Sequence, residues 1–288
     1  YRNALCRSID SKECCVEESS IMVSSAQAQC APMGDPRPRY LGETIRPENG
    51  ESYDWHTHDF GQLISASSGS MYVGTLSRVL LLSPAMAIWI PPNASHWMRY
   101  GSNNEMIYVD VNQTEAFELG SDTRVMAMTP LLNALMLATM PVCDPMRAKK
   151  HVDALHDLLR YEIASARDVS LSIAMPRDKR IRALADMALR DPGSLGSVEA
   201  WLSAAHASRK TIERLFISET GMPPAQWLRY ARLLHAISQL ASGKKIGTVA
   251  FDLGYDSPSA FSHMFRTTLG STPSRFLQRT TGRPRSGT

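Results

Sequence analysis

The chain has 288 residues and a net charge of +3, and this length is sufficient for two domains with a sizeable core. The charge is uneven, because residues 177–288 hold 17 Lys and Arg against 8 Asp and Glu, whereas residues 1–176 hold 14 against 20; a basic C-terminal third is expected to meet a polyanion. The five cysteines lack a repeated spacing and no apolar run reaches about 18 residues, which excludes a secreted disulfide scaffold and a membrane span and predicts a soluble, cytoplasmic protein.

The N-terminal third contains two kinds of sequence. Residues 1–38 show no helical or strand periodicity and are rich in Ser, Glu, Gln and Cys, which predicts a flexible tail. From residue 40 to about residue 111, short apolar segments alternate with Gly, Pro and Asn at the spacing of an all-β sandwich or barrel. The expected strands are 62–66, 70–73, 78–82, 86–90, 96–100 and 106–111.

Three histidines stand out within this β region. His56 and His58 are two residues apart, so on a strand they would project to the same face, and His96 follows on a later strand. The two segments resemble the motifs of the cupin family, a small double-sheet barrel. The chain has Gln62 where that family has Glu, and Asn93 where it has Gly. The first segment contains Gly50, His56, His58, Gln62 and Gly69, and the second contains Pro91, Asn93 and His96.

The barrel site has three interpretations. It is predicted to bind a small-molecule effector through His56, His58, Gln62 and His96. Three imidazoles also suit a divalent transition metal, with His56, His58 and His96 as the ligands, although the neutral Gln62 is a poorer ligand than a carboxylate. The third interpretation is a hydrogen-bonded barrel interior without a ligand.

Residues 129–166 have helical periodicity. The first helix carries its apolar residues at Leu131, Leu132, Leu135 and Met136. The second carries a stripe at helical spacing that we expect to pair with another chain, giving a homodimer, with packing on the barrel as the alternative. That stripe consists of Val152, Leu155, Leu159 and Ile163, with Leu158 beside it. Residues 165–177 read as an interdomain linker.

The basic third of the chain contains a repeat. A shift of 49 residues places Ile212 on Phe261, Phe216 on Phe265, Gly221 on Gly270, Pro224 on Pro273 and Trp227 on Phe276. Such self-similarity indicates one supersecondary unit used twice, and each copy has the outline of a helix-turn-helix.

The signals at the helix ends support this interpretation. Ser208 and Ser257 are placed to cap the second helix of each copy, and Gly221 and Gly270 are placed to end it. Pro224 starts a connecting helix of about 18 residues, or about 27 Å. Neighbouring major-groove faces of B-DNA are about 34 Å apart, so such a helix could hold two recognition helices in successive grooves.

These residues strongly resemble the AraC/XylS family of bacterial transcription regulators, many of which carry an N-terminal cupin-like sensor. The resemblance is close over about 100 residues and looser over the whole chain. It departs from the family at His206, which occupies a turn position where the family usually has Gly. The second copy has the usual Gly there, at Gly254. The matching segments are 250–261, with the sequence AFDLGYDSPSAF, followed by Phe265, Arg266, Gly270, Pro273 and residues 275–277.

The resemblance implies which side chains contact DNA. In the first copy these are Arg209, Lys210 and Arg214, and Arg is suited to bidentate contact with guanine. In the second copy the matching positions are Ser259, His263 and Arg266. Because the first copy has more positive charge, we expect it to dominate affinity.

We therefore predict an α+β multidomain protein. It has a flexible tail at 1–38, a cupin-like barrel at 39–125, a helical connector at 126–176, a double helix-turn-helix domain at 177–280 and a basic tail at 281–288.

The expected function is sequence-specific transcription regulation in the bacterial nucleoid, without enzymatic activity. The expected partners are promoter DNA, a small effector, a second copy of the chain and, for an activator, RNA polymerase. The first alternative is a metal-dependent cupin enzyme of the dioxygenase or isomerase type, against which Gln62 counts. The second is an architectural DNA binder with a vestigial barrel.

Overall fold

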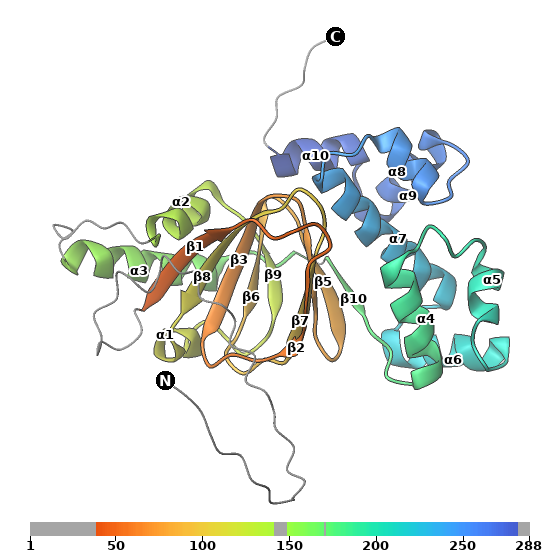
Figure 1. Ribbon diagram of the computed structural model, residues 1–288, viewed down its shortest axis with the longest axis horizontal. Coiled ribbons are helices and arrows are strands. Elements are labelled where there is room, and N and C mark those ends of the chain that lie inside the picture. The colour runs from red at the N-terminus through yellow and green to blue at the C-terminus, as the bar shows by residue number, and fades with distance from the viewer. Residues whose placement is uncertain (1–38, 141–148, 170, 282–288) are drawn as a thin grey trace, which may run out of the picture. The chain divides into compact units, whose positions relative to one another are not determined.

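The computed structural model describes residues 39–140, 149–169 and 171–281 (Figure 1). The tail predicted at 1–38 lies outside these residues, as does all but the first residue of the tail predicted at 281–288. Within the described part of the chain, no helix is long and apolar enough to cross a membrane.

The N-terminal part contains two five-stranded antiparallel sheets. In the first sheet the strand order is β1 (Tyr40–Ile45), β8 (Glu105–Val111), β3 (Gly61–Ser68), β6 (Met86–Ile90) and β9 (Arg124–Ala127). In the second it is β10 (Ser172–Ala174), β5 (Arg78–Leu82), β4 (Met71–Gly74), β7 (His96–Tyr100) and β2 (Ser52–His56).

All six strands expected from the sequence are present, and four further strands complete the sheets. The four are β1, β2, β9 and β10, each of which is the outermost strand of its sheet. Edge strands need less continuous apolar sequence than central ones, which explains why their pattern is weak. Strand β10 pairs with β5 and lies in the segment expected to be a linker, so that segment is part of the sheet structure.

The central strands of the first sheet send alternate side chains into two different cores. One core lies between the two sheets and includes Ile64, Ile88 and Tyr108. The other lies on the opposite face and includes Leu63, Trp89 and Val109. Because successive residues of a strand point to opposite faces, a strand that is apolar throughout must be covered on both sides.

Helices cover this opposite face. A short helix, α1 (Gln113–Phe117), follows β8, and helices α2 (Pro130–Ala138) and α3 (Lys149–Ser165) pack beside β1 and β8 (Figure 1). Leu159 and Ile163 of α3 are fully buried in the second core, and Leu155 is packed against it. The stripe expected to pair with another chain is therefore used inside the chain, and that prediction was wrong.

The C-terminal part is entirely helical. A lead-in helix, α4 (Lys179–Arg190), precedes α5 (Val198–Ser203) and α6 (Arg209–Thr220), and α7 (Pro224–Ala241) connects these to α8 (Ile246–Asp252), α9 (Pro258–Leu269) and α10 (Pro273–Thr281). Figure 1 shows α4 to α6 at one end of α7 and α8 to α10 at the other. Helices α6 and α9 begin and end 49 residues apart, so the repeat read from the sequence is a repeat of structure.

The helix ends follow the predicted signals. The Ser208 hydroxyl accepts from the Thr211 amide at 3.3 Å, and the Ser257 hydroxyl accepts from the Ala260 amide at 3.2 Å. Gly221 and Gly270 end α6 and α9 with φ values of 74° and 72°, in the left-handed region where a Cβ is unfavourable.

The two turns differ in backbone. The 49-residue shift places Gly254 on Ala205, so the departure expected at His206 lies one residue earlier. Gly254 has a φ of 77°, whereas neither Ala205 nor His206 is among the described residues with positive φ. The turn of the first copy therefore has a backbone conformation that does not require glycine. Five residues still separate the end of the first helix from the start of the second, as in the second copy.

Candidate nucleic-acid interface and effector site

Helix α6 has one buried face and one exposed face. Ile212, Leu215 and Phe216 are buried. The predicted contact residues Arg209, Lys210 and Arg214 are all exposed. The structure thus brings the three predicted residues of the first copy to the surface of a capped helix.

The three cations differ in their neighbours. The Arg209 Nε donates to Glu213 at 3.0 Å, and its Nη1 lies 4.0 Å from a Glu199 oxygen. Within the described part of the chain, Arg214 and Lys210 make no hydrogen bond or ion pair through their side chains. Arg209 must therefore exchange a hydrogen-bonded carboxylate for DNA, whereas Arg214 has only a charge interaction with Asp178 and no hydrogen bond to release.

Helix α9 presents the second set. Ser259, His263 and Arg266 are exposed and line a shallow hollow of about 370 Å³ together with Ser262. Phe261, Met264 and Phe265 form the buried face. No carboxylate lines this hollow.

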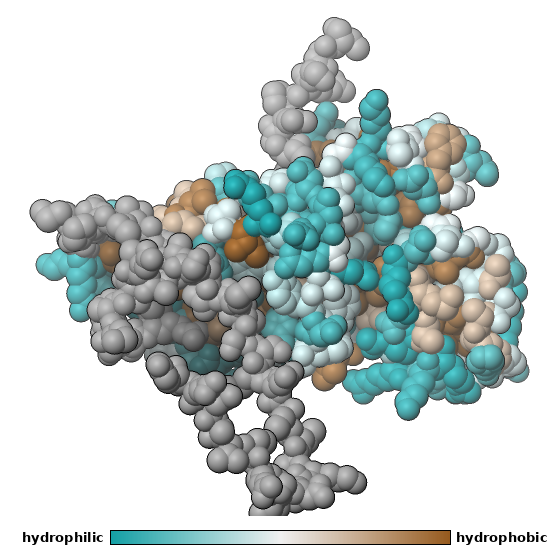
Figure 2. All heavy atoms as spheres, in the orientation of Figure 1, coloured by the Kyte–Doolittle hydropathy of each residue, from teal (hydrophilic) through white to brown (hydrophobic). Residues whose placement is uncertain are grey.

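The charge advantage expected for the first copy is not present on the helices themselves. Helix α6 carries three cationic side chains and two carboxylates, a net charge of +1, and α9 carries Arg266 alone, also +1 with His263 neutral. In the view of Figure 2, hydrophilic residues predominate on the described surface of the helical part, with small hydrophobic areas between them. Helix charge therefore gives no reason to rank the first copy above the second.

Aromatic clusters support both recognition helices, and in the first copy the cluster joins α6 to α7. Trp201, Phe216 and Trp227 pack with ring-centroid distances of 5.6, 6.2 and 5.8 Å. The Trp201 indole donates to Leu184 O in α4 at 3.0 Å, and the Trp227 indole donates to Ala174 O in β10 at 2.7 Å. Buried indoles with satisfied N–H groups hold α6 rigidly, because aromatic rings contribute large buried areas.

The second copy replaces this cluster with phenyl rings. Phe265 lies 5.8 Å from Phe261 and 5.7 Å from Phe276, and Tyr255 lies 5.6 Å from Phe261. Phe265 and Phe276 are the residues that the 49-residue shift places on Phe216 and Trp227. Both recognition helices are therefore supported by aromatic residues at equivalent positions.

The three predicted histidines come together in the β part. The ring centroids of His56 and His96 are 4.2 Å apart, and that of His58 is 5.1 Å from His96. His56 and His96 are partners in the register of β2 and β7. Strand β2 ends at His56, so His58 reaches the cluster from the following loop, where Phe60 stacks on its ring at 4.3 Å.

Backbone carbonyls fix the orientation of all three rings. The Nδ1 atoms of His56, His58 and His96 lie 2.7, 2.5 and 2.8 Å from the carbonyls of Asp54, Phe60 and Ala94. A carbonyl only accepts, so each Nδ1 carries the hydrogen and each Nε2 is an acceptor in the neutral ring. Burial lowers the pKa of His96 to about 4, so this ring is neutral near pH 7.

Two of these acceptors are buried and unused. The Nε2 atoms of His56 and His96 have no hydrogen-bond partner among the described residues. Leaving a buried acceptor unsatisfied costs about 1–3 kcal/mol, so a donor in the site would be stabilised. The Gln62 Nε2 donates to Asp110 at 3.1 Å, whereas its Oε1 is also buried and has no hydrogen-bond partner among the described residues.

The metal interpretation of the cluster stays a prediction. Among residues 39–140, 149–169 and 171–281, no group of three or more His, Cys, Asp or Glu side chains is placed to hold a metal ion. The unused Nε2 atoms of His56 and His96 can instead accept hydrogen bonds from an organic ligand.

The structure also shows a site that the sequence pattern did not single out. Arg229 and Arg232 of α7 and Tyr255 before α9 line a common hollow. Arg229 and Arg232 are three residues apart on a helix, a spacing that places them on neighbouring surface. Nothing in the spacing of Tyr255 indicates that it would join them.

Two family models match the chain. Residues 44–175 match the AraC-like ligand binding domain, and residues 201–279 match a helix-turn-helix domain. The transcriptional regulator NimR of Escherichia coli K12 is 28% identical over 226 residues, which cover 78% of this chain and 82% of that protein.

Two solved structures are also similar. The fatty acid-bound ToxT of Vibrio cholerae has a TM-score of 0.36 and 13% identity, covering 88% of this chain and all of that one. The DNA-binding domain of AdpA, solved with a target DNA, has a TM-score of 0.34 and 33% identity, covering 38% of this chain and 98% of that one. Because both TM-scores are below 0.5, these two likenesses carry no argument. The two matched domains and the similarity to NimR show that this chain belongs to the AraC family of transcriptional regulators, with an AraC-like ligand-binding domain followed by a helix-turn-helix DNA-binding domain.

Proposed function

We propose that this chain binds promoter DNA through α6 and α9 and that a small molecule bound at the histidine cluster alters this binding. The DNA contacts in the proposal are Arg209, Lys210 and Arg214 on α6, and Ser259, His263 and Arg266 on α9. A protein of this kind acts where the promoters are, which is the cytoplasm of a bacterium.

The observation that carries the DNA part is the repeat of α6 and α9. Both helices are 12 residues long, start at a capping Ser and end at a left-handed Gly. The helix between them has 18 residues, or about 27 Å, which is compatible with two successive major-groove segments on one side of a duplex. Exposed cations on both helices supply the attraction to phosphates and base edges.

Selection of bound duplexes from a random pool, followed by fluorescence anisotropy with the full chain, tests this part. We expect a selected sequence with two half-sites about one helical turn apart and binding that persists at about 150 mM salt. A duplex from the region upstream of the gene provides a second probe. Equal affinity for selected and scrambled duplexes would refute sequence-specific binding.

The proposed effector is an uncharged molecule that bears O–H or N–H donors. The two unused acceptors, Nε2 of His56 and of His96, are buried and fixed in tautomer by their Nδ1 contacts. An anion would be repelled by such acceptors, and a purely apolar molecule would leave them unsatisfied. The stacked pair of His58 and Phe60 supplies an apolar surface beside them.

Thermal shift measurements with a panel of small polyols and amides test the effector class. Ligands that raise the melting temperature of the wild type are expected to lose this effect in His96→Phe, which keeps a ring but removes the acceptor. The exposed His151 provides the matched control, His151→Phe. A chelator arm is included, and loss of DNA binding on chelation would favour a metal over an organic effector.

The enzyme alternative is less well supported. A cupin enzyme would need a metal or a general acid and base near the histidines. The carboxylate of Asp110 already accepts a hydrogen bond from Gln62. Turnover of any compound that shifts the melting temperature, followed by mass spectrometry, distinguishes an enzyme from a sensor.

Homodimer formation remains a proposal, now through the apolar residues of α2 and α3 that stay exposed, of which only Leu158 belonged to the expected stripe. Leu131 and Leu137 of α2 and Leu158 and Tyr161 of α3 are large apolar side chains that are more than 40% exposed. Analytical ultracentrifugation of the wild type and Tyr161→Lys tests this surface. A monomer at all concentrations would refute it.

A further inference from the structure

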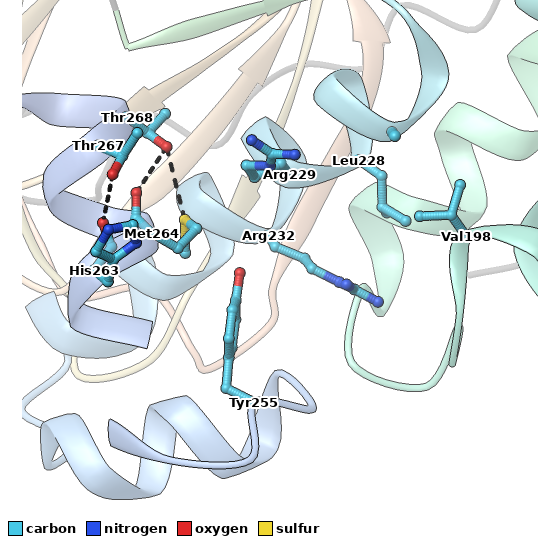
Figure 3. Close-up of a pocket in the computed structure, with 10 residues that line it drawn as sticks. Val198, Leu228, Arg229, Arg232, Tyr255, His263, Met264, Thr267 and Thr268 are labelled. Atoms are coloured by element: carbon cyan, nitrogen blue, oxygen red, sulfur yellow. Dashed lines mark hydrogen bonds between the residues drawn. The ribbon is translucent and has the colours of Figure 1, made fainter. Parts of the chain in front are cut away.

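A hollow of about 410 Å³ lies between the two helix-turn-helix units (Figure 3). Its wall is formed by the start of α5, the first half of α7, the turn before α9, and α9 itself. It borders the predicted interface, because His263 lines both this hollow and the surface hollow of α9. The hollow therefore lies where the two DNA-contacting units meet.

The lining is cationic. Arg229 and Arg232 line it, and none of its ten lining residues is Asp or Glu. Arg229 is exposed, and within the described ranges its side chain makes no hydrogen bond or ion pair. A cation without a carboxylate partner can bind an anion without first releasing another.

Arg232 is held in place by the backbone. Its Nη2 donates to Gly196 O at 2.8 Å and its Nε donates to Pro192 O at 3.3 Å, both in the segment between α4 and α5. These carbonyls orient the guanidinium without neutralising its charge. A charge fixed in this way loses little conformational freedom when a ligand binds.

Tyr255 adds a neutral donor. Figure 3 shows its hydroxyl pointing towards α7, which carries Arg229 and Arg232. Burial raises the pKa of Tyr255, and the positive charges of Arg232 and Arg229 oppose that rise. The hydroxyl hydrogen remains available to an acceptor. By contrast, the Thr267 and Thr268 hydroxyls already donate to the carbonyls of His263 and Met264.

We propose that this hollow binds the DNA sugar-phosphate backbone between the two major-groove segments, with Arg229, Arg232 and Tyr255 contacting phosphate oxygens. The proposal rests on the proposed function, in which α6 and α9 occupy successive grooves on one side of the duplex. The backbone that separates those grooves must then cross the space between the two units. Guanidinium groups suit phosphates because their N–H donors match two oxygens at once.

The salt dependence of DNA binding tests this assignment. Each phosphate contact contributes about 0.9 to the slope of log affinity against log salt, and the contribution is independent of sequence. Arg229→Ala should lower the magnitude of the slope by about 0.9 and weaken selected and scrambled duplexes by the same factor. Between 50 and 200 mM salt, the ratio of wild-type to variant affinity should then change about 3.5-fold.

Two further variants sharpen the measurement. Arg229→Lys keeps the charge and should retain most of the slope. Lys150→Ala removes one exposed charge from α3, outside the helical part, and should leave the slope unchanged. Circular dichroism of each variant checks that α7 remains folded, which is expected because Arg229 is exposed.

Three outcomes decide the matter. If wild-type binding is sequence-specific and Arg229→Ala keeps the wild-type slope, the phosphate assignment is wrong although the proposed function stands. If the wild type shows no specific binding, the proposed function fails first. If inorganic phosphate raises the melting temperature of the wild type but not of Arg229→Ala, while the DNA slope is unchanged, the hollow binds a small anion and the backbone assignment is wrong.

Discussion

Removal of the Arg214 side chain is the most direct test of how α6 recognises DNA. Arg214 lies on the exposed face of α6, and its side chain makes no hydrogen bond or ion pair within the described residues. Arg214→Ala therefore leaves no buried partner unsatisfied and replaces one good helix former with another. The change in unfolding free energy should stay within about 0.5 kcal/mol.

The expected loss is confined to the complex. An Arg that contacts a guanine edge contributes about 1–3 kcal/mol, which corresponds to a decrease in affinity of about 5- to 140-fold. Arg209→Ala should have a smaller effect, because Arg209 already pairs with Glu213 at 3.0 Å and is 64% exposed. Breaking that exposed pair costs about 0.3–0.5 kcal/mol, and this cost reduces the contribution of Arg209 to the free energy of DNA binding.

The assay is fluorescence anisotropy with the selected duplex and with a series of single base-pair replacements. Arg214→Ala should lose the preference for one base pair at a single position of the binding site and keep its preferences at the other positions. Arg209→Ala serves as the matched control on the same helix. If Arg214→Ala weakens every duplex equally and lowers the salt slope by about one unit, Arg214 contacts phosphate and the base-reading role is refuted.

Three further predictions concern stability. Burial lowers the pKa of His96 from 6.5 to about 4, so the folded protein resists protonation of this ring. The free energy of unfolding is therefore at its full value above pH 6.5 and falls by about 3 kcal/mol as the pH drops from 6.5 to 4. Urea titrations at several pH values should show a smaller fall for His96→Gln, and an equal fall in both proteins would contradict this. Phe216→Ala should lose about 3–5 kcal/mol by denaturant unfolding, because the ring is fully buried, whereas Ile217→Ala, 52% exposed, should lose less than about 1 kcal/mol. Gly221→Ala should cost about 1–2 kcal/mol from backbone strain alone, since its φ is +74° and a Cβ would meet nothing within 4 Å; an unchanged melting temperature would show that the left-handed conformation is not required.

Local signals were sufficient for the double helix-turn-helix. Capping serines, left-handed glycines and a proline at the first helical position act within one turn of chain, so their spacing predicted α6 and α9 closely. The six expected strands were found for a similar reason, because side-chain alternation and turn residues are local properties. The exposure of the candidate DNA contacts followed from the same periodicity, since the residues between the buried ones of an amphipathic helix must be exposed. Their contact with DNA is what the family resemblance implies.

The sequence could not show which surface an apolar stripe meets. Leu159 and Ile163 form a stripe that suits a second chain as well as a sheet, and only the tertiary structure shows that they pack on the sheet. The weakly patterned edge strand β10 was missed for a related reason, because its pairing with β5 joins residues about 90 positions apart.

The site chemistry divides in the same way. The sequence by itself determined the repeat, the exposed faces of α6 and α9, and the spacing of His56, His58 and His96. The tertiary structure alone decided the orientation of the imidazoles and the placement of Tyr255 in one hollow with Arg229 and Arg232. The physical reason is that periodicity records which face of an element is buried, whereas partners across elements depend on packing between segments distant in the chain.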